Sequence, residues 1–524
     1  MRSTFIIKPL VTAVAALSVA SVASAAGLSR SEQDVSAFLQ DGTYAETVYT
    51  YIDGDVTGYD LNEDGSKGNK IKDIAESYDF FRYGVKTDIN DTFSIGILYD
   101  EPWGAAADYH GDNSFVGAPI EVADNLISSR LGDKAEDPAD NKGVNNVAEF
   151  KGFINQTANK LAQGEQQLAG LKGFESRLNQ AISAGAPQSQ VDQMVAAQLG
   201  AQNINTYQEL KGTISGTEQT LTEGKENYER LKGLEGVLDK ALANNEATKV
   251  EVRSESLTAL MGMKFGQNKE FQVYGGPVAQ RLKADVKLRG SAYLTATGYD
   301  LNVNPNTDYG WIAGFQYSKP EIGLKAALTY RSEIDHSMDV GETLPLAALT
   351  GTSPSQINKM EVTTPESVNF DFQTGINPTT LATAKVRWVP WSDFAVTPPL
   401  YNDATIKSGD YGPNGLNLID YDDDQWMVEL GLAKRVADNL AVSGTVGWDS
   451  GAGNPVTSLG PVEGYYSVGL GAKYDMTKNW SISAGGKYLW IGDAKGVIPN
   501  GDQVSTFEDN NGFALGVKLS YQDK

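Results

Sequence analysis

The sequence predicts an all-β transmembrane barrel of 14 antiparallel strands, with a long α-helical coiled-coil hairpin inserted in one extracellular loop. Two observations carry this prediction. Stretches of about ten residues alternate apolar with small or polar side chains, which is the period of a strand whose two faces meet different surroundings. Short turns and long connections also alternate along the chain, as they do in barrels of bacterial outer membranes.

Composition excludes several classes of protein. The chain has 524 residues and a net charge of −24, so its surface repels phosphate backbones and we expect no nucleic-acid partner. It has no cysteine, which rules out disulfides and thiolate metal sites. A catalytic histidine would have to be His110 or His336, both expected in loops. His336 lies between Asp335 and Ser337 in sequence, but adjacent residues cannot form a catalytic triad by themselves, so we expect no enzyme activity.

The first 25 residues read as a secretory signal peptide. Arg2 and Lys8 form its positive region, residues 10–22 its apolar region, and residues 23–25 an A-x-A cleavage site. Residues 26–42 then form a short N-terminal segment that could act as a hatch in the barrel. No later stretch is apolar over the roughly 18–20 residues that a spanning helix needs. The exported protein is therefore either soluble or crosses a membrane as strands.

The strand pattern is clearest at the C-terminus, where each odd position of residues 513–521 is large and apolar. Residues 43–104 supply barrel strands 1–3, residues 105–249 the insert and residues 250–524 strands 4–14. The predicted strands are 43–53, 78–90, 91–101, 250–265, 270–288, 308–318, 321–334, 365–376, 379–391, 424–437, 439–449, 463–476, 479–491 and 511–521.

Connection lengths distinguish a membrane barrel from a soluble β-sandwich, which would show the same alternation. Short turns follow even-numbered strands, at residues 90–91, 319–321, 377–379, 438–439 and 477–479. Long connections follow odd-numbered strands, which is the asymmetry of periplasmic turns and extracellular loops. Tryptophans near predicted strand ends fit the aromatic girdles of a membrane barrel: Trp388, Trp391, Trp426, Trp448, Trp480 and Trp490.

The insert repeats itself at an offset of sixty residues. EFKG at 149–152 recurs as ELKG at 209–212, and LKGFE at 171–175 recurs as LKGLE at 231–235. Apolar residues follow spacings of three, four and seven, which predicts two helices paired as a coiled coil. By loop parity this hairpin lies outside the cell. It could cap the barrel mouth, offer a contact surface to other cells or phage, or be a diversified loop without a role of its own.

Two further motifs point to local features. In Glu101-Pro102-Trp103-Gly104, proline lacks the ladder N–H and glycine has no side chain to pack, so strand pairing should fail there and the strand should kink. Alternatively, Pro102 simply begins the next loop. Asp60, Asn62 and Asp64 have the spacing that opens a calcium loop, but the twelfth position is Ile71 instead of glutamate. This makes a weak calcium candidate, with a solvated acidic loop as the alternative.

Several short segments resemble the FadL family of outer-membrane transporters for long-chain fatty acids and other hydrophobic compounds. They occur in the family's order and, with the predicted barrel, cover most of the chain outside the insert. They are YIDGDV at 51–56, ALTYRSEI at 327–334, TPESV at 364–368, WSDF at 391–394, and DNL at 438–440 with PV at 455–456.

The resemblance implies a protein of the Gram-negative outer membrane that takes up hydrophobic compounds passively and needs no cofactor. Ligand would be captured at the extracellular mouth and would leave sideways into outer-membrane lipid through a kink in the third strand, which residues 101–104 match. We expect a monomer. The alternatives are a cell-surface adhesion or receptor protein that displays the hairpin, and a general porin.

Two expectations concern the lumen. Inward-facing Lys325, Arg331, Lys385 and Arg387 could bind the carboxylate of a fatty acid, or they could brace the wall by pairing with acidic residues. Family members commonly have a longer N-terminal hatch with an Asn-Pro-Ala motif, which this sequence lacks. Residues 26–42, with Phe38 and Leu39, could still plug the lumen.

Overall fold

The computed structural model describes residues 28–117, 123–124, 127–128, 143–243, 246–345, 347 and 353–523. The predicted signal peptide lies outside these residues. The chain divides into a barrel unit, built from residues up to 117, 245–344 and 355–524, and a second unit built from residues 118–244 and 345–354. Within the described residues no helix is long and apolar enough to span a membrane.

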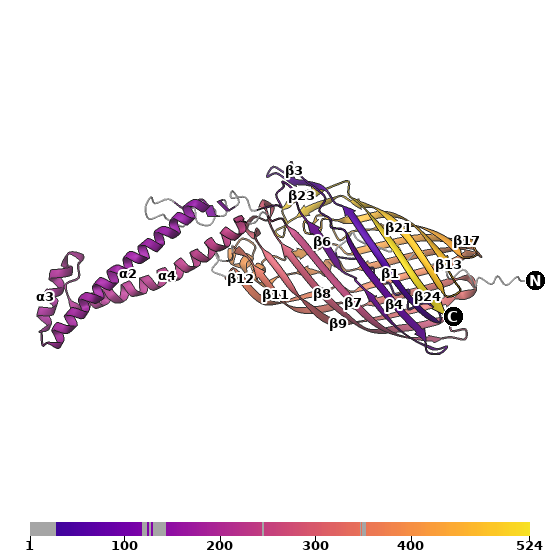
Figure 1. Cartoon of the computed structure of the whole chain (residues 1–524), viewed down its shortest axis with the longest axis horizontal. Coiled ribbons are helices and arrows are strands. Elements are labelled where there is room, and N and C mark those ends of the chain that lie inside the picture. Colours follow the sequence, from indigo (N-terminus) through magenta and orange to yellow (C-terminus); the bar gives the residue numbers. More distant parts are fainter. Residues whose placement is uncertain are drawn as a thin grey trace, which may run out of the picture. The chain divides into compact units, whose positions relative to one another are not determined.

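The barrel unit is a closed antiparallel sheet (Figure 1). It contains seventeen strand segments, and because three strands are each interrupted once, these form the predicted 14 strands of the wall. The first strand, β1, pairs with both the last strand, β24, and β4, which closes the sheet. The segments are β1 (Thr43–Asp55), β4 (Tyr78–Asp88), β5 (Phe93–Asp100), β6 (Gly104–Asp108), β7 (Lys249–Phe265), β8 (Phe271–Lys287), β9 (Asp300–Lys319), β10 (Leu324–Arg331), β11 (Ile334–Thr343), β12 (Ser355–Thr364), β13 (Ser367–Asn377), β14 (Thr380–Val389), β17 (Gln425–Ala437), β18 (Leu440–Asp449), β20 (Glu463–Asp475), β21 (Trp480–Gly492) and β24 (Asn511–Asp523).

Most predicted strands match the observed ones within a few residues, but the middle of the barrel is taller than predicted. β9 begins at Asp300 instead of residue 308, and β11 and β12 extend strands 7 and 8 by whole segments. Along β11 the inward residues are Ile334, His336, Met338, Val340 and Glu342, whereas Asp335, Ser337 and Asp339 face outward. This part of the wall has no row of apolar residues on its outer face. The alternation that predicts the other strands, with apolar residues facing outward, is therefore absent here. His336, expected in a loop, is therefore a buried strand residue.

The third strand also runs further than predicted. Both β5 and β6 pair with β7, so the wall continues through Asp108 and the insert begins after the boundary expected at residue 105.

The predicted apolar stripes lie on the outside of the barrel. On β24 the side chains of Phe513, Leu515, Val517 and Leu519 are all exposed, while the alternate positions between them are buried. Exposed tryptophans near strand ends include Trp426, Trp448, Trp480 and Trp490, as expected of girdles. Trp391 is an exception, because it is fully buried in the short helix η6 (Trp391–Asp393).

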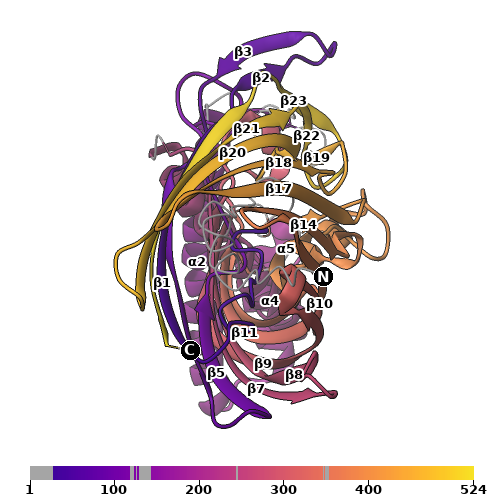
Figure 2. The same ribbon diagram turned by 90° about the vertical axis from the view of Figure 1, so that its right-hand side faces the viewer.

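The loops of the barrel carry their own small elements. A five-stranded sheet in the order β19-β22-β23-β2-β3 gathers at the top of Figure 2. The loop elements are β2 (Gly58–Leu61), β3 (Lys67–Ile71), η3 (Ser291–Ala296), η4 (Pro320–Ile322), β15 (Ala395–Val396), α5 (Pro399–Ser408), β16 (Ile419–Asp420), β19 (Val456–Thr457), β22 (Ala494–Val497) and β23 (Gln503–Phe507).

The second unit is a helical hairpin, as the repeat predicts. Its helices are α2 (Val147–Ser183), α3 (Gln188–Leu199), η2 (Gly200–Gln202) and α4 (Tyr207–Ala243). Ion pairs such as Lys151–Asp239 and Lys172–Glu218 show that α2 and α4 run antiparallel. Added Cβ atoms at Gly164 and Gly224 would press on Leu221 and Leu161 respectively. These two contacts are related by the sixty-residue offset, so the repeat packs on itself.

Candidate functional site: a plugged lumen with an apolar cavity

The N-terminal segment, residues 28–41, lies inside the barrel and is called the plug here. Its side chains are almost all buried, with Val35, Ala37 and Phe38 in one apolar cluster with wall residues such as Leu260 and Tyr274. A segment this short has too few apolar residues to bury itself. Its position is therefore fixed by contacts with the wall.

Basic side chains of the wall bind the plug through an ion pair and through hydrogen bonds to its backbone and side chains. Lys385 Nζ lies 2.9 Å from Glu32 Oε2, and Arg387 donates to the backbone oxygen of Glu32 at 2.9 Å. Arg387 also donates to Gln33 Oε1, and Ser367 donates to the same oxygen. Both Glu32 and Gln33 adopt left-handed backbone with φ of 56° and 55°, which non-glycine residues rarely do. These contacts stabilise that strained turn.

Acidic residues of the plug are held in their charged form. Burial alone would raise the pKa of the Glu32 carboxyl, but the charges of Lys385 and Lys487 outweigh burial, so this pKa lies below its ordinary value. The pKa of Asp34 is also lowered, because Lys385, Arg82 and hydrogen bonds from Ser36 outweigh burial. The plug is therefore docked by buried charges that each have a partner, and breaking one such pair would leave a buried charge unpaired.

Wall glycines make room for the apolar part of the plug. A Cβ at Gly96 would lie 2.7 Å from Phe38 Cδ2, and one at Gly262 would lie 3.0 Å from Phe38 Cζ. A Cβ at Gly84 would lie 2.6 Å from the Cβ of Ala37. The three glycines come from β4, β5 and β7, so they form a recess into which Ala37 and Phe38 fit.

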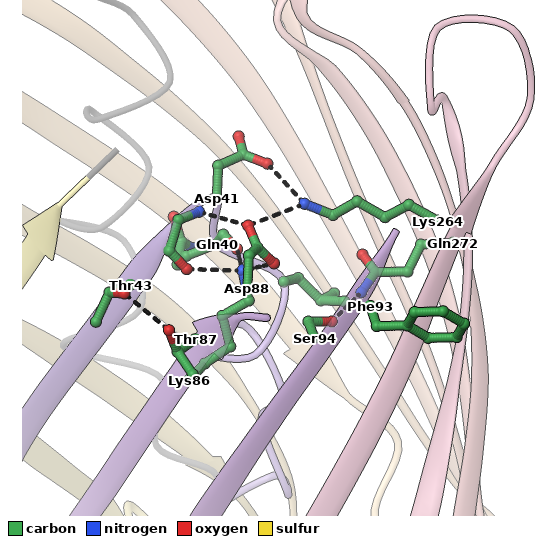
Figure 3. A network of polar contacts seen from close by, with 12 residues as sticks. Gln40, Asp41, Thr43, Lys86, Thr87, Asp88, Phe93, Ser94, Lys264 and Gln272 are labelled. Atoms are coloured by element: carbon green, nitrogen blue, oxygen red, sulfur yellow. Dashed lines mark hydrogen bonds and ion pairs between the residues drawn. The ribbon is translucent and has the colours of Figure 1, made fainter. Parts of the chain in front are cut away.

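The end of the plug is anchored where it becomes β1 (Figure 3). Lys86 Nζ donates to the backbone oxygens of Gln40 at 2.7 Å and Gly42 at 2.9 Å, and to Asp88 at 2.6 Å. Asp88 in turn accepts from the backbone nitrogen of Gly42 at 2.8 Å. This end of the plug is fixed, so any movement of the plug would have to begin nearer the N-terminus.

The wall is broken beside the plug's other end. β5 and β6 both pair with β7, but Asp100 faces Ser256 whereas Gly104 faces Arg253, so one extra residue bulges between them. β4 pairs with β5 only from Tyr83 to Asp88. Although all these residues are described, no ladder pair joins residues 78–82 of β4 to β5 or β6. We call this interruption the β4–β6 gap.

Residues 28–30 of the plug cover this gap. Arg30 N donates to the backbone oxygen of Pro102 and Gly104 N donates to that of Leu28, both at 2.7 Å. The Arg30 guanidinium lies 4.0 Å from the centre of the Tyr78 ring, on the β4 side. A Cβ at Gly104 would collide with this guanidinium. The plug thus binds one edge of the gap through its backbone and the other through the Arg30 side chain.

An apolar cavity of about 50 Å³ adjoins the covered gap. Leu28 of the plug and Trp103 of the gap both line it. Among the described residues that form its wall, all are apolar except Thr364. The others are Val252, Leu282, Ala284, Val286, Leu301, Val303, Met338, Met360, Val362, Pro365, Trp391, Phe394, Val396, Leu418 and Ile419. Such a lining suits an uncharged, apolar group.

A second cavity, of about 140 Å³, lies beside the plug toward the short turns. Charged side chains line it, among them Asp34, Lys325, Asp371, Lys385 and Glu429. The lumen is therefore apolar on one side of the plug and charged on the other. An apolar molecule would lose favourable surroundings if it continued along the barrel axis.

The predicted site residues fall into distinct groups. Glu101 is half-buried, and Pro102, Trp103 and Gly104 are buried at the β4–β6 gap. Of the predicted lumen cations, Lys325 donates to the backbone oxygen of Leu39, and Lys385 and Arg387 bind Glu32, so these three contact the plug. Arg331 is buried on the same inner wall. Their contact with a ligand stays a prediction.

The residues of the calcium candidate form hydrogen bonds around their own loop. Asp60 accepts backbone hydrogen bonds from Asn69 and Ser114, and Asp64 accepts from the backbone and side chain of Ser66. Asn62 likewise bonds within the loop, to Ser66. Within the described chain, no group of three or more acidic, histidine or cysteine residues could hold a metal ion. Calcium binding at this loop stays a prediction.

Sequence reasoning missed Arg30 and the glycine recess. Arg30 is a single charge in a short segment, and nothing in its neighbours marks it as buried. Gly84, Gly96 and Gly262 were visible as small residues on inward positions of three strands. Small inward residues on several strands of a barrel are a usable signal for something packed in the lumen.

These features define a class of protein: an outer-membrane β-barrel whose lumen is plugged and holds an apolar cavity. Comparison with known proteins agrees. Residues 268–522 match the family described as outer membrane protein transport protein (OMPP1/FadL/TodX). This match covers just under half of the chain, which therefore resembles the FadL/TodX family in the fold of its outer-membrane transporters of hydrophobic compounds.

Solved structures resemble the barrel at low sequence identity. A FadL homologue from Pseudomonas aeruginosa is 12% identical, with a TM-score of 0.54 over 92% of this chain and 90% of that chain. The toluene transporter TodX from Pseudomonas putida is 9% identical, with a TM-score of 0.45 over 96% of each chain. No curated protein matches the sequence significantly. At these identities the likeness shows the fold alone.

Proposed function

We propose that this protein carries hydrophobic small molecules, including long-chain fatty acids, passively across the outer membrane. The apolar cavity supports this proposal most directly. It lies inside a barrel, almost all of its lining is apolar, and it adjoins a break in the wall. Burying each CH₂ group of a ligand there would gain roughly 0.8 kcal/mol.

The path we propose leads sideways. Ligand is captured at the long-loop end, which we place outside the cell, and binds in the apolar cavity. The kink at residues 101–104 and the β4–β6 gap then let it leave into membrane lipid once residues 28–30 move aside. The charged cavity on the other side of the plug disfavours continued passage toward the short turns. A barrel that closes on itself can do this as a monomer.

The lumen cations bear on the choice of ligand. Arg387 lies 5.5 Å from the Trp103 ring, so a guanidinium is close to the cavity although it does not line it. Because Arg387 already binds Glu32 and Gln33, a ligand carboxylate would compete with the plug for it. We expect that a fatty acid could loosen the plug in this way, whereas an alkane could not.

The test compares uptake of a radiolabelled long-chain fatty acid with that of the alkane of equal chain length. Cells that lack their own transporter would express the protein or an empty vector. Saturable uptake of either compound above the vector supports the proposal, and the ratio of the two shows whether a carboxylate matters. Uptake of neither, with a correctly inserted barrel, would contradict it.

The helical insert is proposed to be an extracellular coiled coil that is separate from the transport path. The hairpin and the barrel belong to separate compact units. The buried apolar side chains of the hairpin pack against one another. This assigns transport to the barrel instead of making the barrel a display scaffold for the hairpin.

A further inference from the structure

The wall has a second interruption, far from the first in sequence. β9 pairs with β10 through residues 312–319 and with β11 through residues 300–303. Between these ladders, residues 304–311 run beside residues 332–339 of the neighbouring strand. Both stretches are described, yet no ladder pair joins them. We call this stretch the β9–β11 seam.

The sequence explains why backbone pairing fails at the seam. Pro305 has no N–H to donate, and proline is rarely tolerated in an interior strand. The ladder between β8 and β9 also shifts register beside it, between Leu282 and Ala284. The β4–β6 gap has the same two features, Pro102 and a one-residue bulge against β7.

Side chains replace the missing backbone bonds of the seam. Asn306 Nδ2 donates to the backbone oxygen of Ser337 at 2.9 Å, and Asp308 Oδ2 accepts from the backbone nitrogen of Ser337 at 3.3 Å. At the end of the seam next to β10, Trp311 N donates to the Ser332 hydroxyl at 3.0 Å and Ser332 N donates to the backbone oxygen of Trp311 at 2.9 Å, so this one backbone bond remains. Side chains can rotate away while the strands stay in place, so this closure is easier to undo than a backbone ladder.

Two polar atoms at the seam are buried without a hydrogen-bond partner, namely Asn306 Oδ1 and His336 Nδ1. The His336 side chain is completely buried. Its Nε2 lies 3.0 Å from Gln280 Oε1, while Asp308 Oδ2 is 3.6 Å from Nδ1. Buried polar atoms are nearly always satisfied, so this pair marks a place where another polar group fits.

The seam borders the apolar cavity. Val303 and Met338 line the cavity, and they belong to the two strands that the seam separates. On the outside, Tyr309 and Trp311 are exposed, and Trp311 packs on Tyr330 with ring centres 5.1 Å apart. Exposed aromatic residues of this kind prefer the membrane interface. The seam thus separates an apolar cavity from the level of the lipid headgroups.

We propose that the β9–β11 seam is a second side opening, through which hydrophobic compounds with a small polar group pass between the apolar cavity and the outer leaflet. This rests on the proposed transport function. The hydrocarbon part of such a compound would lie against Val303 and Met338. Its polar group would meet Asn306 and His336 as the compound passes.

Crosslinking tests the proposal, because the chain has no cysteine of its own. The flanking ladders place Asn306 opposite Ser337, so N306C/S337C would lock the seam when oxidised. N302C/G341C is the matched control, because Asn302 and Gly341 face each other on the same two strands where the ladder is intact. An added Cβ at Gly341 meets no atom within 4 Å.

We expect oxidation of N306C/S337C to lower the initial rate of hydrophobic uptake and a reductant to restore it, with no change in the control pair. Uptake that is unaffected by the locked seam would overturn the proposal. If the unmodified protein takes up nothing, the proposed transport function is wrong. A measurement that needs no transport then tests whether the seam opens.

That measurement is thiol labelling in the membrane. Single variants His336→Cys and Val340→Cys place a thiol on the same inner face of β11, at the seam and at the intact ladder respectively. A lipid-soluble maleimide should label position 336 faster than position 340. Equal labelling of the two would show that the seam stays closed, whatever the uptake result. Heat-dependent gel migration would confirm that each barrel is folded.

Discussion

Removing the Phe38 side chain should undock the plug. Phe38 is fully buried, lies 5.8 Å from the Tyr274 ring centre and fills the recess made by Gly96 and Gly262. Truncating a buried phenylalanine to alanine costs about 3–5 kcal/mol, because transfer free energy is lost and a cavity remains. At 1.36 kcal/mol for each factor of ten, the ratio of docked to undocked plug should fall by roughly 10² to 10⁴.

The assay uses a single cysteine at Ala37, which is buried in the docked plug. Its labelling by a water-soluble maleimide reports the undocked fraction when docking is fast relative to labelling. Phe38→Ala should raise the labelling rate by a factor of that order. Phe315→Ala is the matched control, because Phe315 is exposed on the outside of the barrel and should leave labelling unchanged.

Unchanged labelling in Phe38→Ala would refute the reasoning. It would mean that the polar contacts of Glu32 and Gln33 hold the plug without its apolar anchor. A rise in both variants would instead indicate a general loss of barrel stability.

Three further outcomes are expected. Arg30→Ala removes a contact with Tyr78 worth about 0.5–2 kcal/mol, so conductance in planar bilayers should rise by roughly 2- to 30-fold, and less in Arg30→Lys. The pKa of Glu32 is lowered in the docked plug, so ionised Glu32 stabilises docking. This stabilisation is fully present above the ordinary pKa of 4.5 and is lost as pH falls through the lowered pKa. Conductance should therefore rise only below pH 4.5 in the unmodified barrel, and Glu32→Gln should conduct at neutral pH as well. Replacing residues 118–244 by a short flexible linker should leave uptake unchanged, because Gly117 N already donates to the backbone oxygen of Glu246 at 2.7 Å; lost uptake would give the hairpin a part in transport.

The barrel could be predicted because lipid imposes a strict period of two on the outer face. Where strands rise above the apolar band, as in β11 and β12, their outward residues apart from Ile357 are polar or glycine, and that signal disappears. The helical hairpin could be predicted because its repeat keeps helical spacing. Trp391 was placed in a girdle from its position near a strand end, but it turns inward at the loop that lines the cavity.

The site could be predicted only in part. Pro102 and Gly104 mark the wall break, since their effect on pairing is local. The partners of Lys385 and Arg387 could not be predicted, because Glu32 is more than 350 residues away in sequence and meets them only inside the closed barrel. Pro305 carried the same local signal as Pro102. It was missed because the predicted strand began at residue 308.

The central claim is that hydrophobic compounds pass through this barrel when the plug moves away from the β4–β6 gap. Ser31 Oγ donates to Asp100 Oδ2 at 3.2 Å, so S31C/D100C would tie the plug to the wall at the gap. T43C/T87C is the control, since these hydroxyls lie 2.9 Å apart on neighbouring strands (Figure 3). The rate of uptake of a radiolabelled long-chain fatty acid should fall when S31C/D100C is oxidised, recover on reduction and stay constant in the control. Undiminished uptake through the locked barrel would contradict the account.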